Sequence, residues 1–170
     1  MKRTISLLSV LLFTAVSLVF AGSFQWKKVS SEQYHFAVEM PDISEVNQSD
    51  LINTWSVASK STGLGFSIVV GESRGAYSDD LKIAQENLDK AAEWTLKELN
   101  GKILNKRFFS YQGNPSVEAR ALVTTKGKKA LVIERIILTK KESYVLFYTA
   151  APSRYNPRDA EKYFDSLQIL

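Results

Sequence analysis

The alternation of apolar and polar residues predicts short β strands in the first half of the chain. Residues 26–29 and 35–40 each have the pattern of a strand, and Pro41, which has no backbone donor, ends the second one. Residues 51–60 and 65–70 follow as two further strands, joined by a turn that contains glycine. We therefore expect four strands before the first helix.

A spacing of three and four residues between apolar positions predicts a long helix over residues 78–100. Ser78 is the expected N-cap, and Asp79 and Asp80 suit the positive end of the helix. Asn100-Gly101 tolerates a positive φ at the exit. The stripe expected to face the core comprises Leu81, Ala84, Leu88, Ala91, Thr95 and Leu99.

Four strand patterns follow the helix, at residues 102–111, 117–125, 130–139 and 143–150. Short turns rich in glycine, asparagine, proline and lysine separate them. Because connections this short join antiparallel neighbours, the four segments predict a meander. The third segment is apolar on both faces, which predicts that helices cover both sides of the sheet.

The chain ends with a second helix pattern. Asn156 and Pro157 open it, with proline at the first helical position, where a missing donor costs nothing. Residues 168–170 can add a final strand. Strands before and after the central helix predict an α+β fold, in which residues 23–170 form one domain with a mostly antiparallel sheet flanked by helices.

These elements resemble the PsbP-like superfamily, which includes the PsbP, DcrB and Mog families, and especially its small exported bacterial members. The resemblance rests on Trp26, Phe36-x-Val38-x-Met40-Pro41, the central helix, Gly113-x-Pro115 and the ending Ala160-x-x-Tyr163-Phe164-Asp165-Ser166-Leu167. It implies an α/β/α sandwich with an antiparallel sheet, and roles in docking onto other proteins. It carries no shared catalytic residues, so it supplies architecture and little function.

The first 21 residues have the pattern of an export signal. Lys2 and Arg3 precede an uncharged run over residues 5–20, and residues 19–21 match the small-residue cleavage pattern. This run is shorter than the roughly 20 apolar residues that a transmembrane helix needs. We therefore expect cleavage after residue 21 and a periplasmic or secreted protein without a transmembrane helix. The alternative is a membrane-anchored protein that keeps the segment.

Composition and charge narrow the function classes further. The chain has 170 residues, with 22 Lys and Arg, 18 Asp and Glu, one His and no Cys, and 45% of it is hydrophobic. Such a composition excludes a disordered chain, a disulfide scaffold and a thiolate metal site. Removing the signal would take away two cations and lower the net charge from +4 to +2, so nucleic acid is not an expected partner.

Ser73 is the only catalytic candidate that a motif supports. Residues 71–75 match G-x-S-x-G directly after an apolar strand, but a nucleophile elbow also needs an immediate helix. The expected helix begins several residues later, and the only imidazole, His35, precedes the serine instead of following it. We therefore favour a glycine-flanked loop over a small serine hydrolase that uses Ser73 and His35.

No cofactor or metal site is expected. A zinc site would depend on carboxylates, because the chain has only His35 and no Cys. Asp79 and Asp80 are interpreted as helix-start charges and not as calcium ligands, and the sequence has no glycine-rich phosphate loop. His35 is interpreted as a strand residue beside the core.

Glu134 shares a predicted strand face with apolar residues. A buried carboxylate must be paired or protonated, and Arg120 or Arg135 could lie nearby across strands. We favour a structural salt bridge over a ligand pocket at Glu134.

Lysines crowd two predicted turns and are candidates for electrostatic docking onto an acidic partner or anionic lipid. The residues are Lys126, Lys128, Lys129, Lys140 and Lys141. Solvated hairpin tips are the commoner explanation of such clusters. Trp26 and Trp55 would mark an interaction surface if either were exposed.

Taken together, the sequence predicts a non-enzymatic exported accessory or adapter domain of the cell envelope that acts by protein–protein contact. Its partner is not encoded in any motif. The alternatives are a serine hydrolase at Ser73 and a carrier of a small apolar ligand between sheet and helix.

Overall fold

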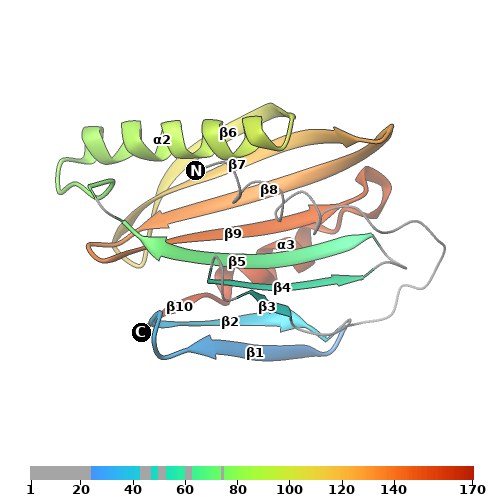
Figure 1. Cartoon of the computed structure of the whole chain (residues 1–170), viewed down its shortest axis with the longest axis horizontal. Coiled ribbons are helices and arrows are strands. Elements are labelled where there is room, and N and C mark those ends of the chain that lie inside the picture. Colours follow the sequence, from blue (N-terminus) through green and yellow to red (C-terminus); the bar gives the residue numbers. More distant parts are fainter. Residues whose placement is uncertain (1–23, 43–46, 50–52, 60–62, 74) are drawn as a thin grey trace.

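A computed structural model describes residues 24–42, 47–49, 53–59, 63–73 and 75–170 (Figure 1). The expected export signal lies outside these residues. In the described part, two antiparallel sheets and two α-helices are arranged as an α+β domain, as the sequence predicts.

The main sheet has seven strands in the order β3-β4-β5-β9-β8-β7-β6, and all neighbours are antiparallel. They are β3 (Asn47–Ser49), β4 (Thr54–Ser59), β5 (Leu64–Glu72), β6 (Gly101–Tyr111), β7 (Asn114–Thr125), β8 (Lys128–Leu138) and β9 (Glu142–Ala150). The predicted meander is confirmed as β6 to β9, and β5 pairs with β9 at its far side.

Two-residue turns close the first two hairpins of the meander. Gln112 and Gly113 both have positive φ, at 50° and 80°, and Lys126 and Gly127 at 50° and 74°. Positive φ at both positions is the conformation of a type I′ turn, whose twist matches that of the flanking strands. The turns therefore fix the register of β6, β7 and β8.

A smaller sheet has the order β1-β2-β10, with β1 (Trp26–Ser31), β2 (Phe36–Pro41) and β10 (Gln168–Ile169). The predicted final strand is confirmed, because β10 pairs antiparallel with β2. The first and last strands of the described chain thus lie in one sheet below the main one (Figure 1).

The central helix is α2 (Leu81–Glu98), and its N-cap is Asp80 and not Ser78. The Asp80 carboxylate accepts hydrogen bonds from the backbone N–H groups of Lys82, at 2.8 Å, and Ile83. The Ser78 hydroxyl accepts from the Asp80 N–H instead. A carboxylate is favoured here because it can meet two free amides at the positive helix end. Asn100, with a φ of 53°, ends the helix as expected.

The predicted buried stripe of α2 is only partly correct. The fully buried residues repeat at every fourth position and are Ala84, Leu88, Ala92 and Leu96. Leu81 is the first helical residue, is 62% exposed and belongs to neither core cluster.

The last helix, α3 (Pro157–Asp165), begins as predicted. Asn156 is its N-cap and accepts a hydrogen bond from the Arg158 N–H at 3.1 Å. A short 3₁₀ turn, Pro152–Arg154, connects β9 to it.

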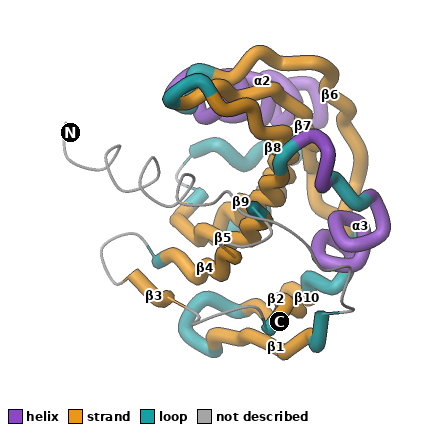
Figure 2. The backbone as a smooth tube through the Cα atoms, turned by 90° about the vertical axis from the view of Figure 1, so that its right-hand side faces the viewer, coloured by secondary structure: helices purple, strands orange, loops and turns teal. Residues whose placement is uncertain are grey.

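Each face of the main sheet packs against its own core. One core joins the sheet to α2, through residues such as Leu88, Val117 and Val132. The other joins it to α3 and the small sheet, through residues such as Phe36 and Phe164. Figure 2 shows the two helices on different sides of the main sheet. The expected cover on both faces is confirmed, but the second face is covered by a helix together with a sheet.

Candidate functional site

The structure separates the two candidate catalytic residues. Glu72, the last residue of β5, is in register with Glu142, and the Glu142 carboxylate contacts the His35 ring. Ser73 follows the end of β5 and is buried, with its N–H donating to the Lys141 carbonyl at 3.0 Å, whereas the His35 side chain is 49% exposed. Helix α2 begins only at Leu81, whereas a nucleophile elbow requires a helix directly after the serine. Ser73 and His35 are therefore not brought together.

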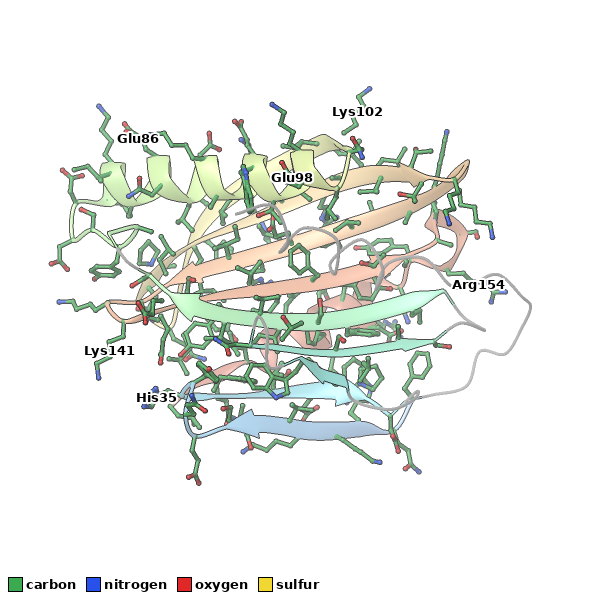
Figure 3. The ribbon with its side chains drawn as sticks, in the orientation of Figure 1. His35, Glu86, Glu98, Lys102, Lys141 and Arg154 are labelled. Carbon is green, nitrogen blue, oxygen red and sulfur yellow. The ribbon has the colours of Figure 1, made fainter. Side chains whose placement is uncertain are left out.

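The expectation that His35 is a strand residue beside the core is wrong, because it lies in the turn between β1 and β2, with a φ of 46°, and is exposed. There it belongs to a polar cluster at one end of the small sheet (Figure 3). Its Nδ1 lies 2.8 Å from the Glu142 Oε1, and the Tyr144 hydroxyl donates to the Glu142 Oε2 at 2.7 Å. Burial, together with this bond to Glu142, raises the pKa of Tyr144. Because the Leu170 N–H donates to the His35 carbonyl at 2.8 Å, the cluster ties the end of the chain to β9.

Glu134 is fully buried in the layer between α2 and the main sheet. Neither carboxylate oxygen has a hydrogen-bond partner among the described residues. Burial raises the pKa of Glu134 well above its usual value, and the nearby Thr95 hydroxyl offsets this only in part. Thr95 donates its own hydrogen bond to the Ala91 carbonyl at 3.0 Å. This environment therefore favours the neutral carboxylic acid form of Glu134.

The expected pairing of Glu134 with Arg120 or Arg135 is wrong. In the β7–β8 ladder, Glu134 lies opposite Ala119 and Arg120 lies opposite Ile133, so the two charges belong to opposite faces. Arg135 is the next residue of the same strand and points away from Glu134 for the same reason.

The arginines converge on Glu118, an ionic centre that the sequence analysis did not identify. The Glu118 carboxylate accepts hydrogen bonds from Arg135 at 2.9 Å and from Arg107 at 3.0 Å, and Arg120 lies 3.6 Å away. Burial would raise the pKa of the Glu118 carboxyl, but the hydrogen bonds from Arg107 and Arg135 outweigh it and hold that pKa below its usual value. This carboxylate is therefore ionised in the folded protein.

Aromatic rings and one further acid complete the environment of Arg135, whose side chain is only 5% exposed. Its guanidinium donates to Asp165, at the end of α3, at 3.0 Å. It also lies over three rings, at 4.7 to 5.6 Å from the centroids of Phe109, Tyr111 and Phe164. Through these ion pairs and ring contacts, the cluster connects the main sheet to α3.

The candidate lysines lie at opposite ends of the main sheet, and all of them are exposed. Lys126, Lys128 and Lys129 form the tip between β7 and β8, near the start of β6. Lys140 and Lys141 form the tip between β8 and β9, and Lys140 reaches Asp79 at 3.6 Å. The structure therefore offers two separate basic ends and not one basic patch.

Large apolar side chains reach the surface of the described part. Trp55 is buried and Trp26 is half-buried, so the exposed tryptophan is Trp94 of α2, at 60%. On β6, Leu104 is 55% and Phe108 is 40% exposed. The helical period of 3.6 residues could have predicted the exposure of Trp94, because it lies two residues from the buried Ala92 and so faces away from the sheet.

Within the described ranges, no three His, Asp or Glu side chains are placed so that they could hold a metal ion. No described helix is long and apolar enough to span a membrane.

No known family model and no curated protein sequence matches the chain. Solved structures do resemble it. Cyanobacterial PsbP from Synechocystis is 11% identical with a TM-score of 0.58, and the match covers 91% of this chain and 98% of that one. The Ran-binding protein Mog1p from Saccharomyces cerevisiae is 11% identical with a TM-score of 0.57, covering 86% and 96%. The chain therefore has the PsbP/Mog-like fold that its sequence resembles.

Proposed function

We propose that this chain is an exported domain of the cell envelope that acts by contact with another protein and not by catalysis. The fold supports a binding role, since Mog1p, which shares it, is a Ran-binding protein. The partner of Mog1p is not transferred to this chain, and only the mode of action, binding to another protein, is carried over.

The observation that carries the proposal is the exposure of large apolar side chains on regular elements. Trp94 on α2 and Leu104 and Phe108 on β6 are held on rigid secondary structure and are between 40% and 60% exposed. Tryptophan and phenylalanine are enriched where proteins meet, because covering them releases much apolar surface from water. These three side chains are therefore candidates for a contact surface.

The proposed export is supported by how the signal pattern relates to the fold. The cut expected after residue 21 precedes the first strand, which begins at Trp26. Processing would therefore leave every described strand and helix intact. Mass spectrometry of the protein isolated from its cells should give a chain that starts at Gly22. A cytosolic protein with its original N-terminus would contradict the proposal.

Chemical crosslinking in intact cells tests the binding role directly. We expect a reproducible crosslinked product that contains this chain and another envelope protein. The double variant Lys128→Glu, Lys129→Glu should reduce its yield if the tip between β7 and β8 takes part. The matched control is Lys140→Glu, Lys141→Glu at the other end of the sheet. An unchanged yield in the first variant would remove the lysine tip from the contact.

Two assays address the alternative functions. A purified chain that hydrolyses esters, and loses this activity in Ser73→Ala, would favour the hydrolase. Native mass spectrometry that finds a co-purified apolar molecule would favour the carrier. We expect neither result.

A further inference from the structure

Strand β6 forms an outer edge of the main sheet, and it is by far the longest strand at an edge. No described strand pairs with its outer side. It has 11 residues, whereas the opposite edge, β3, has three, and β1 in the small sheet has six. An unpaired edge presents backbone N–H and C=O groups that can pair with a further strand.

Two of the three cations on β6, which could protect such an edge, are held in ion pairs within the chain. Lysine and arginine on an edge strand normally project into solvent and repel added strands. The Lys106 Nζ instead binds Asp89 and Glu93 of α2, at 2.5 Å and 2.8 Å. The Arg107 guanidinium binds Glu118 on the neighbouring strand. Lys106 is thereby held against α2 and is only 20% exposed, while Arg107 is paired with Glu118 and stays 65% exposed.

A bulge also interrupts edges, but in β6 it is confined to one end. The register shifts between Ile103 and Asn105, and from Asn105 to Tyr111 every residue pairs in order with β7. Seven consecutive residues therefore form a regular ladder. This length exceeds that of a typical strand, which is about five or six residues.

Apolar and charged groups on β6 indicate what kind of strand would fit. Leu104 and Phe108 are exposed and can contact apolar side chains of an added segment. Residues 101–111 contain Lys102, Lys106 and Arg107 and no acidic residue. Lys102 lies at the same end of the sheet as the lysine tip between β7 and β8.

Charge decides between a second copy of this chain and a different partner. Two β6 edges pairing with one another would bring together two strands that each carry three cations and no acidic residue, and only Lys106 and Arg107 are balanced by ion pairs. The remaining positive charge makes this pairing unfavourable. A segment with carboxylates would complement Lys102 and the lysine tip. The edge is thus matched to an acidic strand and not to itself.

We propose that the free edge of β6 binds an extended acidic segment of a partner protein by strand addition. This inference rests on the proposed function as a binding domain and names the surface and the chemistry of the partner. Backbone hydrogen bonds along residues 105–111 supply the pairing, and Phe108 and Lys102 select for a segment that alternates apolar residues with carboxylates.

A peptide titration tests the edge in vitro. The probe is a blocked decapeptide of alternating Glu and Ile, long enough to extend from residue 111 to Lys102, and its control has Lys in place of Glu. In NMR spectra of the isotope-labelled protein, the acidic peptide should shift the amides of residues 101–111 and slow the exchange of those that face outward. The lysine peptide should not bind. Shifts that map elsewhere, equal binding of both peptides, or no shift at millimolar peptide would overturn the proposal.

Variants sharpen the titration. Lys102→Glu and Phe108→Ser should each weaken binding of the acidic peptide by roughly tenfold. Leu81→Ser is the matched control, because Leu81 is 62% exposed on α2 and away from β6. Thermal melting of each variant confirms that it is folded. Equal losses in all three variants would contradict a specific role for the edge.

Photocrosslinking in cells separates this inference from the proposed function. A photoreactive amino acid is placed at position 104, on β6, or at position 81, on α2. A product with another protein that forms from position 104 and is lost in Lys102→Glu supports the inference. A product containing two copies of this chain, or products from position 81 alone, overturn it and leave the binding role standing. No product from either position would count against both.

Discussion

Replacing Glu134 by glutamine should make the stability of the protein less dependent on pH. The side chain is fully buried, and no described residue bonds to either of its carboxylate oxygens. The neighbours that face it are Ala119 and Phe147 across the strands and Thr95 on α2, none of which titrates in this range. Glutamine keeps the shape and removes the proton equilibrium, so the variant isolates a single titration.

The sign of the effect follows from the raised pKa of Glu134 in the folded protein. Below its ordinary value of 4.5, the group is protonated in both the folded and the unfolded chain, and it has no effect on the pH dependence. At higher pH the unfolded chain loses the proton while the folded chain keeps it. Each pH unit then lowers the free energy of unfolding by about 1.4 kcal/mol, until the folded group also ionises.

Urea unfolding at pH 5, 6 and 7 measures this slope. The difference in free energy of unfolding between Glu134→Gln and the parent should grow by about 1.4 kcal/mol per pH unit in favour of the variant. A constant cost of burying the amide shifts all three values equally and leaves the slope intact. Glu98→Gln, at an exposed position of α2 (Figure 3), is the matched surface control for this substitution. A flat difference for Glu134→Gln would show that the buried carboxyl is already ionised, and would refute the argument.

Five other substitutions test the charge network, the packing and the end of α2. Glu118→Gln should lower the free energy of unfolding by about 3 kcal/mol, because it removes the buried carboxylate that pairs with Arg135. Asp165→Asn, at the 68% exposed partner of Arg135, should cost less than about 1 kcal/mol in the same urea experiment. Gly101→Ala should lower the free energy of unfolding by about 1 to 3 kcal/mol, since the new Cβ would lie 2.9 Å from the Leu96 carbonyl oxygen. The control is Gly71→Ala, whose Cβ would meet Ser143 at an ordinary 3.5 Å and should change stability by no more than about 0.5 kcal/mol. Asn100→Ala should cost about 1 kcal/mol by calorimetry, because alanine is strained at the φ of 53° that ends α2, and an unchanged melting temperature would contradict this account of the helix end.

Local patterns were sufficient to predict the elements that depend on local chemistry. The hairpins of the meander follow from period-two alternation and from turns such as Lys126-Gly127, in which both residues adopt positive φ. The start of α3 follows from Asn156 and Pro157 in the same way. The N-cap of α2 was misplaced because Ser78, Asp79 and Asp80 are all good capping residues, and only the packing of the helix decides among them.

The sequence did not predict which charged side chains contact one another across neighbouring strands. The face of Glu134 was predicted correctly, but its proposed partners were not, because the position of Arg120 depends on the register set by the turn between β7 and β8. For Arg135 the alternation alone was enough to exclude the contact, since adjacent residues of a strand point to opposite faces. Recognition of Glu118 as the ionic centre needed both the register of β7 with β6 and the position of α3.

The two buried glutamates respond to pH in opposite directions because the sheet gives each one a different face. Glu118 faces arginines, so its pKa is lowered and its stabilising effect is lost as the pH falls below its ordinary value. Glu134 faces the apolar layer under α2, so its pKa is raised and its effect is lost as the pH rises above the same value. The summed contribution of the two carboxyl groups to the free energy of unfolding is therefore greatest near pH 4.5, which is the ordinary pKa of both side chains. The arginines that keep Glu118 charged include Arg107 of β6, so the same ion pair that stabilises the fold also holds a cation back from the free edge of the sheet.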